Sequence, residues 1–298
     1  MKKLIIILIF LFTLLGAGKK ATILAPATPS SIPIILTAQD KDWQVELFMN
    51  HSRAHSLFLK GDADILVTGL SVGKKFYEQK IPIKIINSFV SGLSYLVSYD
   101  DSLQNFQDLK NREIYLPFQG APLEEVTKYF VNQSGLNWEQ DVSPRYAPFP
   151  STVNMLLNNK IEVAILPEPF VTKIVYTNPD IEIAISYFEA WNHFTGQKDG
   201  YPQVASFIKS DNEIKSELVA KFNNSLRESI DYIQNYPDSA VKLVRSRFDL
   251  SETMLKKSLS RTHFSPVTGQ DLQNKITDYY QLLDKPIDET YQTFFLDD

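Results

Sequence analysis

Residues 57–67 read Leu-Phe-Leu-Lys-Gly-Asp-Ala-Asp-Ile-Leu-Val, and residues 155–165 read Met-Leu-Leu-Asn-Asn-Lys-Ile-Glu-Val-Ala-Ile. Both stretches begin with apolar residues, pass through Gly61 or Asn159 and an acidic residue, and end in an apolar β-branched run. Glycine and asparagine are the residues that most readily take the positive φ found at helix C-termini. The pattern therefore predicts, twice in one chain, a helix that turns directly into a buried strand.

A second pair of stretches precedes the first. Residues 21–26 (Ala-Thr-Ile-Leu-Ala-Pro) resemble residues 112–117 (Arg-Glu-Ile-Tyr-Leu-Pro), and each leads to a proline suited to a first helical turn, Pro29 or Pro122. The chain thus repeats a strand-loop-helix and helix-strand unit. Two similar α/β lobes that face each other enclose a cleft, which is typical of proteins that bind small molecules.

Length and composition fit this arrangement. A chain of 298 residues is long enough for two α/β lobes, and 44% hydrophobic with 22% charged residues is ordinary for a soluble protein. The net charge of −5 argues against nucleic acid as the main partner. The absence of cysteine excludes disulfides, thiolate catalysis and cysteine-bound metals.

Residues 1–18 have the order of a signal peptide. Lys2 and Lys3 precede the apolar residues 4–15, and the small residues 16–18 follow. The apolar run is short for a membrane span. We therefore expect a periplasmic or otherwise extracytoplasmic protein, soluble or held by an uncleaved signal, without a lipid anchor because no lipid-accepting cysteine is present.

Periodicity and turn residues predict the remaining elements. Strands are expected at residues 21–25, 45–49, 64–67, 81–89, 93–99, 113–116, 142–147, 161–166, 181–187 and 204–208. Helices are expected at residues 29–41, 53–60, 122–133, 151–158, 211–236, 237–248, 251–260 and 268–283, with a polar turn at 68–71. Asp211 and Ser251 are suited to cap two of the later helices, and Gly135 to end the helix at 122–133.

The expected strands divide into two lobes. Residues 19–97 and 200–298 form the first lobe, which carries the C-terminal helices, and residues 98–199 form the second. The chain would cross between the lobes near residues 98–109 and again near residues 191–201. Two crossing segments form a hinge that can close the lobes around a ligand.

Candidate ligand-binding residues lie in loops at the carboxyl ends of the strands, where open α/β sheets bind ligands. Several of these loops lead into helix N-termini, whose free N–H groups receive polar or anionic groups, although the same residues can also be ordinary caps and turns. The expected ligand-binding residues are Thr28, Thr68, Ser71, Gln119, Gly120, Glu168 and Trp191. Aromatic residues expected near the cleft suit a flat ligand, although core packing also explains aromatic residues; they are Phe118, Phe149, Phe170, Trp191 and Phe194.

Glu168 is the most specific candidate. Pro167 and Pro169 stiffen its turn directly after an expected buried strand, which holds the carboxylate at the mouth of the cleft. A carboxylate there can accept a hydrogen bond from a ligand amine or ring N–H. The alternative is a solvent-exposed turn residue.

Residues 59–65 (Leu-Lys-Gly-Asp-Ala-Asp-Ile), 108–114 (Asp-Leu-Lys-Asn-Arg-Glu-Ile) and 166–170 (Leu-Pro-Glu-Pro-Phe) resemble periplasmic binding proteins of ABC importers. Within that family the chain most resembles the nitrate, taurine, sulfonate and thiamine-precursor binders, and the resemblance covers residues 20–260. Asn111 stands where that family has a glycine. Residues 119–121 (Gln-Gly-Ala) stand where the family often has Gly-Ser. The resemblance implies a two-lobed α/β periplasmic-binding-protein type II fold, with a hinge and a helical C-terminal region.

His51 and His55 are four residues apart, which on a helix would place both imidazoles on one face. A metal pair is conceivable, but the sequence offers no third ligand, and His51 is expected to precede the helix. We expect no metal and no cofactor. Serine-hydrolase and nucleotide-binding motifs are absent from the sequence.

The leading hypothesis is a monomeric, non-enzymatic solute-binding protein that delivers a small organic ligand to an ABC permease and ATPase complex. A thiamine-type pyrimidine or a flavin is preferred as ligand, with a sulfonate as alternative, because only Arg53 and Arg145 are basic residues expected near the cleft. Alternatives are an enzyme on the same fold, of the menaquinone-pathway or pyrimidine-synthase type, and a sensory module that presents a ligand to a receptor. The expected signal peptide argues against both enzymes, and the absence of cysteine argues further against the synthase.

Overall fold

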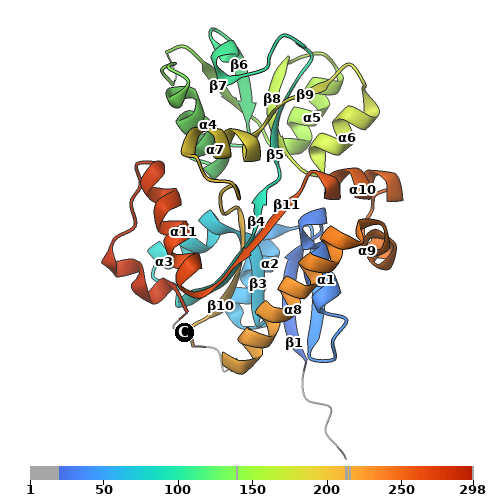
Figure 1. Ribbon diagram of the computed structural model, residues 1–298, viewed down its shortest axis with the longest axis vertical. Coiled ribbons are helices and arrows are strands. Elements are labelled where there is room, and N and C mark those ends of the chain that lie inside the picture. The colour runs from blue at the N-terminus through green and yellow to red at the C-terminus, as the bar shows by residue number, and fades with distance from the viewer. Residues whose placement is uncertain (1–19, 139, 212–213, 215, 297–298) are drawn as a thin grey trace, which may run out of the picture.

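The computed structural model describes residues 20–138, 140–211, 214 and 216–296, so the predicted signal peptide at residues 1–18 lies outside the described residues. Two β-sheets, each covered by helices, lie one above the other (Figure 1). We call the lower sheet, with its helices α1–α3 and α8–α11, the first lobe. The upper sheet with helices α4–α7 is the second lobe.

The first sheet has six strands in the order β11-β4-β10-β3-β1-β2. Strand β1 pairs in parallel with β2 and β3, whereas β10 runs antiparallel to both β3 and β4, and β11 antiparallel to β4. The strands are β1 (Ala21–Pro26), β2 (Trp43–Phe48), β3 (Ile65–Gly69), β4 (Ile83–Gly92), β10 (Val204–Lys209) and β11 (His263–Val267).

The second sheet has five strands in the order β7-β6-β8-β5-β9. Strand β6 pairs in parallel with β7 and β8, and β5 runs antiparallel to β8 and β9. This order repeats β2-β1-β3-β10-β4 of the first sheet, so the internal repeat predicted from the sequence is confirmed. The strands are β5 (Ser94–Ser98), β6 (Glu113–Leu116), β7 (Ser143–Tyr146), β8 (Val163–Pro167) and β9 (Glu182–Ser186).

The helices are α1 (Ile32–Thr37), α2 (His51–Lys60), α3 (Leu70–Glu78), α4 (Pro122–Gln133), α5 (Phe149–Leu157), α6 (Phe170–Thr177), α7 (Tyr187–Thr195), α8 (Ser216–Asn235), α9 (Pro237–Val244), α10 (Glu252–Ser260) and α11 (Gly269–Leu282). The left-handed residues that mark the repeat are confirmed, with φ of 84° at Gly61 and 53° at Asn159. Gly135 also takes a positive φ, just after α4. The predicted cap of α10 is present, because the Ser251 side chain accepts a hydrogen bond from Met254 N.

Several predicted elements were wrong. Residues 68–71 are not a polar turn, because the short buried strand β3 leads straight into α3 at Leu70. His51 does not precede a helix but begins α2, and α8 begins at Ser216, too late for Asp211 to cap it. The strand β11, which lies at the edge of the first sheet, was not predicted. Pro266 within β11 is compatible with an edge strand, which needs fewer backbone donors.

The chain first crosses between the lobes at Leu93, the single residue between β4 and β5, and not within residues 98–109. Strand β5 therefore belongs to the second sheet, although the predicted first lobe extends to residue 97; the division into folding units stays a prediction. The second crossing, residues 196–203, overlaps the predicted one. It runs beside the first, since Tyr201 N donates to Ser91 O at 3.2 Å and Gln203 N donates to Val90 O at 2.9 Å.

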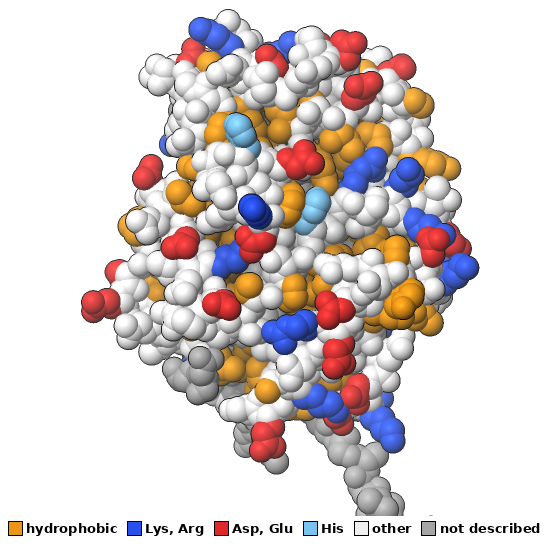
Figure 2. Space-filling model, viewed as in Figure 1, with side chains coloured by type: hydrophobic (Ala, Val, Ile, Leu, Met, Phe, Trp, Pro, Cys, Tyr) orange, Lys and Arg blue, Asp and Glu red, His pale blue; other side chains and the backbone are white. Residues whose placement is uncertain are grey.

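The visible surface carries no broad area of one charge. Acidic and basic side chains are interspersed over the face in Figure 2. This pattern agrees with the argument from net charge against a nucleic-acid surface. Within the described residues, no helix is both long enough and apolar enough to cross a membrane.

Candidate functional site

A pocket of about 320 Å³ lies between the two lobes. The carboxyl ends of β3 and β8 reach it, and so do the first residues of α3, α4 and α5. Leu93 and the segment from Tyr201 to Gln203 line it as well, so both crossing segments form part of its wall. The pocket therefore lies where the sequence predicts ligand binding, at strand ends that face each other across the hinge.

Aromatic rings form much of the wall. Tyr201 and Tyr279 stack with ring centroids 5.7 Å apart and an angle of 6° between the planes. Phe118, in the loop that follows β6, is 60% exposed although it lines the pocket. Tyr279 and Tyr280 come from α11, far along the chain, and sequence reasoning missed both. Nothing in the helical pattern of α11 indicates which lobe or cleft the helix faces.

Three residues that line the pocket carry a buried polar atom without a hydrogen-bond partner, counting described residues only: Tyr201 (Oη), Gln203 (Oε1) and Tyr280 (Oη). Burial raises the pKa of Tyr201, and this effect outweighs the lowering by nearby Gln203 and Ser94. Burial also raises the pKa of Tyr280. Both phenols therefore keep their protons at neutral pH. All three polar atoms are closed off from solvent, so they do not face the open space of the pocket.

Two histidines lie at one end of the pocket. His51 lines it, and His55 Nε2 lies 3.3 Å from Oγ1 of Thr68. Burial lowers the pKa of both imidazoles, and the neighbouring His51 lowers that of His55 further. The two rings are 6.0 Å apart. Among the described residues, no group of three or more His, Cys, Asp or Glu is placed to hold a metal ion.

The structure brings only part of the predicted site together. Thr68 and Ser71 line the pocket, and Thr68 is buried. Thr28 lies outside it and shares a 2.8 Å hydrogen bond with Ser30. Gln119 and Gly120 line a separate hollow beside α4, because the loop turns away at Gly120, whose N–H donates to Glu124.

Trp191 is a core residue. Its side chain in α7 is 0% exposed, and its Nε1 donates to Gln197 at 2.8 Å. Its ring packs against Tyr129 and Tyr201. The ring thus supports the pocket wall through Tyr201 rather than lining the pocket.

Glu168 is neither exposed nor at the cleft mouth. It is only 5% exposed, and its carboxylate accepts hydrogen bonds from Oγ1 of Thr172 at 3.0 Å and from N of Thr172 at 3.3 Å. Nη1 of Arg261, which follows α10 of the first lobe, lies 3.7 Å away. Burial raises the pKa of Glu168, and this effect outweighs the lowering by Thr172 and Arg261. The side chain turns toward the start of α6 because these partners lie there, and Pro167 lines the pocket instead.

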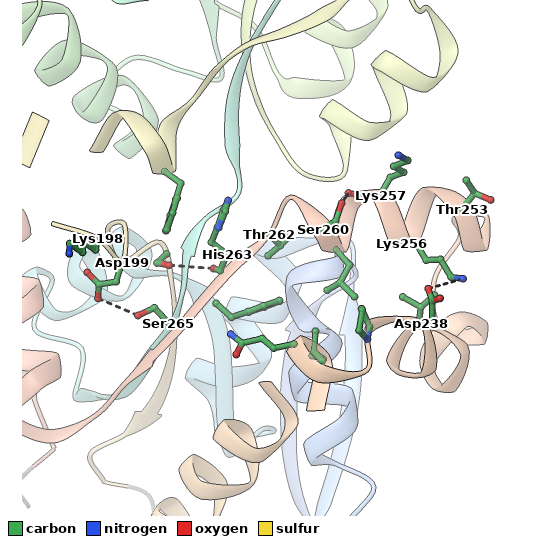
Figure 3. Close-up of a pocket in the computed structure, with 18 residues that line it drawn as sticks. Lys198, Asp199, Asp238, Thr253, Lys256, Lys257, Ser260, Thr262, His263 and Ser265 are labelled. Carbon is green, nitrogen blue, oxygen red and sulfur yellow. Dashed lines mark hydrogen bonds and ion pairs between the residues drawn. The ribbon is translucent and has the colours of Figure 1, made fainter. Parts of the chain in front are cut away.

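A larger cavity of about 800 Å³ lies between α7, α8–α10 and β11 (Figure 3). Three of its charged side chains have partners, since Lys256 lies 2.9 Å from Asp238 and Asp199 accepts a hydrogen bond from Ser265. The ring of His263 stacks on Phe188 at 3.8 Å. None of its described lining residues carries an unpartnered buried polar atom, and it shares no lining residue with the cleft pocket. The smaller cleft pocket is therefore the better candidate.

Comparison with solved structures identifies the fold. An ABC transporter protein from Parabacteroides distasonis superposes with a TM-score of 0.74 at 18% identity, covering 94% of this chain and 96% of the other. The periplasmic aliphatic sulphonate binding protein SsuA from Escherichia coli superposes with a TM-score of 0.72 at 11% identity, covering 92% and 97%. The chain has the periplasmic binding protein fold. This result confirms the predicted fold class. It also shows that the chain is similar in structure to the periplasmic binding proteins that its sequence resembles.

A third similar structure is the zinc-bound ligand-binding component of an ABC-type import system from Staphylococcus aureus. Its TM-score is 0.72 at 13% identity, covering 94% of this chain and 97% of that one. No protein-family model matches the sequence, and neither does a curated protein. At these identities the comparison establishes the fold and leaves ligand and partners to be inferred from the site.

Proposed function

We propose that the protein is the solute-binding component of an ABC importer, outside the cytoplasmic membrane, and that it does no chemistry. It binds a small organic ligand in the cleft pocket and delivers it to a permease. The observation that carries the proposal is a pocket at strand ends from both lobes, in a fold shared with ligand-binding components of import systems. Export rests on the signal-peptide pattern of residues 1–18.

The pocket has the composition of a small-molecule site. Such sites are largely apolar and aromatic, with a few polar groups that fix the ligand's orientation. Here the side chains of Thr68 and Ser71 supply polar groups. We assign ligand binding to these residues in place of Thr28, Gln119, Gly120, Glu168 and Trp191, because none of these five lines the pocket.

A thermal-unfolding screen against vitamins and their precursors, sulfonates and inorganic anions tests the proposal. A ligand at about one hundred times its Kd should stabilise the protein by about 3 kcal/mol. Ser71→Phe would place a ring in the pocket and should abolish this stabilisation. Met49→Phe adds the same ring at a position that is 88% exposed and should leave it unchanged. Equal stabilisation of both variants would contradict binding in this pocket.

A further inference from the structure

The turn between α10 and β11 belongs to the first lobe but contacts three elements of the second. Nη1 of Arg261 donates to Oγ1 of Thr172 in α6 at 3.0 Å, and the Arg261 carbonyl oxygen accepts a hydrogen bond from the Tyr95 hydroxyl in β5 at 2.6 Å. The ring of His263 stacks on Phe188 of α7, with centroids 3.8 Å apart and 3° between the planes. The turn is therefore a third, non-covalent connection between the lobes.

The polar part of this connection is buried. Oε1 of Glu168 lies 3.7 Å from Nη1 of Arg261, whose side chain is only 26% exposed. Glu168, Thr172 and Tyr95 are all buried. Because water is largely excluded, these hydrogen bonds are stronger electrostatically than bonds on the surface. We call Tyr95, Glu168, Thr172 and Arg261 the latch.

A second contact between the lobes is more exposed. Glu125 of α4 pairs with Lys285, which follows α11 of the first lobe, and the Lys285 side chain is half exposed. Exposed ion pairs contribute little, because water and salt screen them. Helix α11 lies on the opposite side of the molecule from α10 (Figure 1). The latch is therefore the stronger of these two contacts.

The latch lies next to the cleft pocket but outside it. None of its four residues lines the pocket, whereas Pro167, which directly precedes Glu168, does. His263 pairs with Gly92 of β4, one residue before the first crossing at Leu93. A separation of the lobes about the two crossings would draw α6 and β5 away from the turn and break the bonds of the latch. Such bonds can break and form again, because water replaces the lost partner.

We infer, resting on the proposed function, that the latch holds the lobes at the angle seen in the structure and that its release opens the cleft pocket for a ligand to enter or leave. Hydrogen bonds, unlike the two crossings, can be released without breaking the chain, so the latch is a reversible restraint on the hinge. Arg261 is then a positioning residue, because it acts on a ligand only through the angle between the lobes.

Spin labels on the whole protein measure this angle. The chain contains no cysteine, so two introduced cysteines react specifically. Met49→Cys and Gln119→Cys lie at exposed positions in loops at strand ends that face each other across the cleft, outside the cleft pocket. Arg261→Met keeps an unbranched side chain but removes the charge and its donors. We expect Arg261→Met to shift the label distances to larger values and to broaden their distribution.

Arg112→Met is the matched control. The Arg112 side chain is 25% exposed and also pairs with carboxylates, those of Asp100 and Glu162, but all three residues lie in the second lobe. This substitution should leave the label distances unchanged. An unchanged distribution in Arg261→Met, or an equal shift in Arg112→Met, would overturn the inference.

A milder pair of variants decides the question if Arg261→Met does not fold. Tyr95→Phe removes the hydroxyl that donates to the carbonyl of Arg261. Tyr99→Phe removes a hydroxyl that donates to the Leu156 carbonyl at 2.7 Å, entirely within the second lobe. Only Tyr95→Phe should then lengthen the label distances, and equal distributions for the two variants would overturn the inference.

The latch and the proposed function are tested separately. The label distances are measured without ligand, on protein refolded from denaturant to remove bound small molecules. A negative result removes the latch and leaves ligand binding intact. The absence of any stabilising compound in the thermal-unfolding screen would contradict the proposed function and would not alter the measured distances.

Discussion

The carboxylate of Glu168 lies at a contact between the two lobes. Arg261 donates from Nη1 to Oγ1 of Thr172 at 3.0 Å, and its carbonyl accepts a hydrogen bond from the Tyr95 hydroxyl at 2.6 Å. Glu168 therefore belongs to a small polar network that joins the turn after α10 to the second lobe. Its burial has a measurable consequence for the stability of the fold.

Because burial raises the pKa of Glu168 above its usual 4.5, the folded state binds this proton more tightly than the unfolded state. The contribution of the carboxyl group to stability must then fall as pH rises from about 4.5 to the folded-state pKa, and stay constant above it. We expect the unfolding free energy of the wild type, relative to Glu168→Gln, to decrease across this window in denaturant titrations. Exposed Glu182→Gln is the control. An increase with pH would contradict the burial argument.

Gly200 permits the close approach of the two crossing segments. Its φ is +64°, and an added Cβ would lie 2.3 Å from the carbonyl oxygen of Ser91. Gly135 also has a positive φ, of +81°, but nothing lies within 4 Å of its added Cβ. Gly135→Ala should therefore cost only the conformational penalty of about 1–2 kcal/mol. Gly200→Ala should cost clearly more, measured by chemical unfolding; equal losses would show that the crossing segments can separate freely.

At the scale of elements, the C-terminal helices hold the lobes together. Helix α10 belongs to the first lobe but packs on α6 of the second (Figure 1). The start of α10 depends on the Ser251 cap, whose hydroxyl oxygen lies 3.2 Å from Met254 N. A helix cap of this kind can be predicted from the sequence, because the capping residue and the amide that it binds are only three positions apart.

Ser251→Ala should destabilise the protein by about 1 kcal/mol, because the first turn of α10 loses its side-chain acceptor. Ser260→Ala removes a hydroxyl at the other end of the same helix, which donates to Lys257 O. Ser260→Ala should reduce the stability less than Ser251→Ala, because it leaves no backbone N–H without a hydrogen-bond partner. Thermal unfolding of both variants measures the difference, and a larger loss for Ser260→Ala would contradict this account of the cap.

At the scale of the whole molecule, the crossing at Leu93 and the crossing at residues 196–203 are the two chain connections expected to act as the hinge. If ligand closes the lobes, small-angle scattering should give a smaller radius of gyration with saturating ligand than without it. Ser71→Phe at the same ligand concentration should show a smaller change. Identical curves for free and saturated wild type would remove the hinge proposal without removing the binding proposal.

The sequence by itself determined the repeated architecture. Gly61 and Asn159 take the left-handed conformation because few other residues tolerate it, and the apolar runs after them form the buried strands β3 and β8. Helix α4 and strand β6 have the predicted bounds. All of these features depend on neighbours within a few residues, so local patterns are sufficient to indicate them.

Tertiary structure alone decided which side chains meet in the cleft. Tyr279 and Tyr280 reach the pocket from α11, and Gln203 reaches it from the second crossing, although no local pattern marks them. Glu168 is buried because Thr172 and distant Arg261 attract its carboxylate, whereas its flanking prolines predicted a carboxylate at the mouth of the cleft. The strand ends predicted the location of the cleft, but its lining depends on the packing of segments far apart in the chain, and sequence spacing carries no information about those distances.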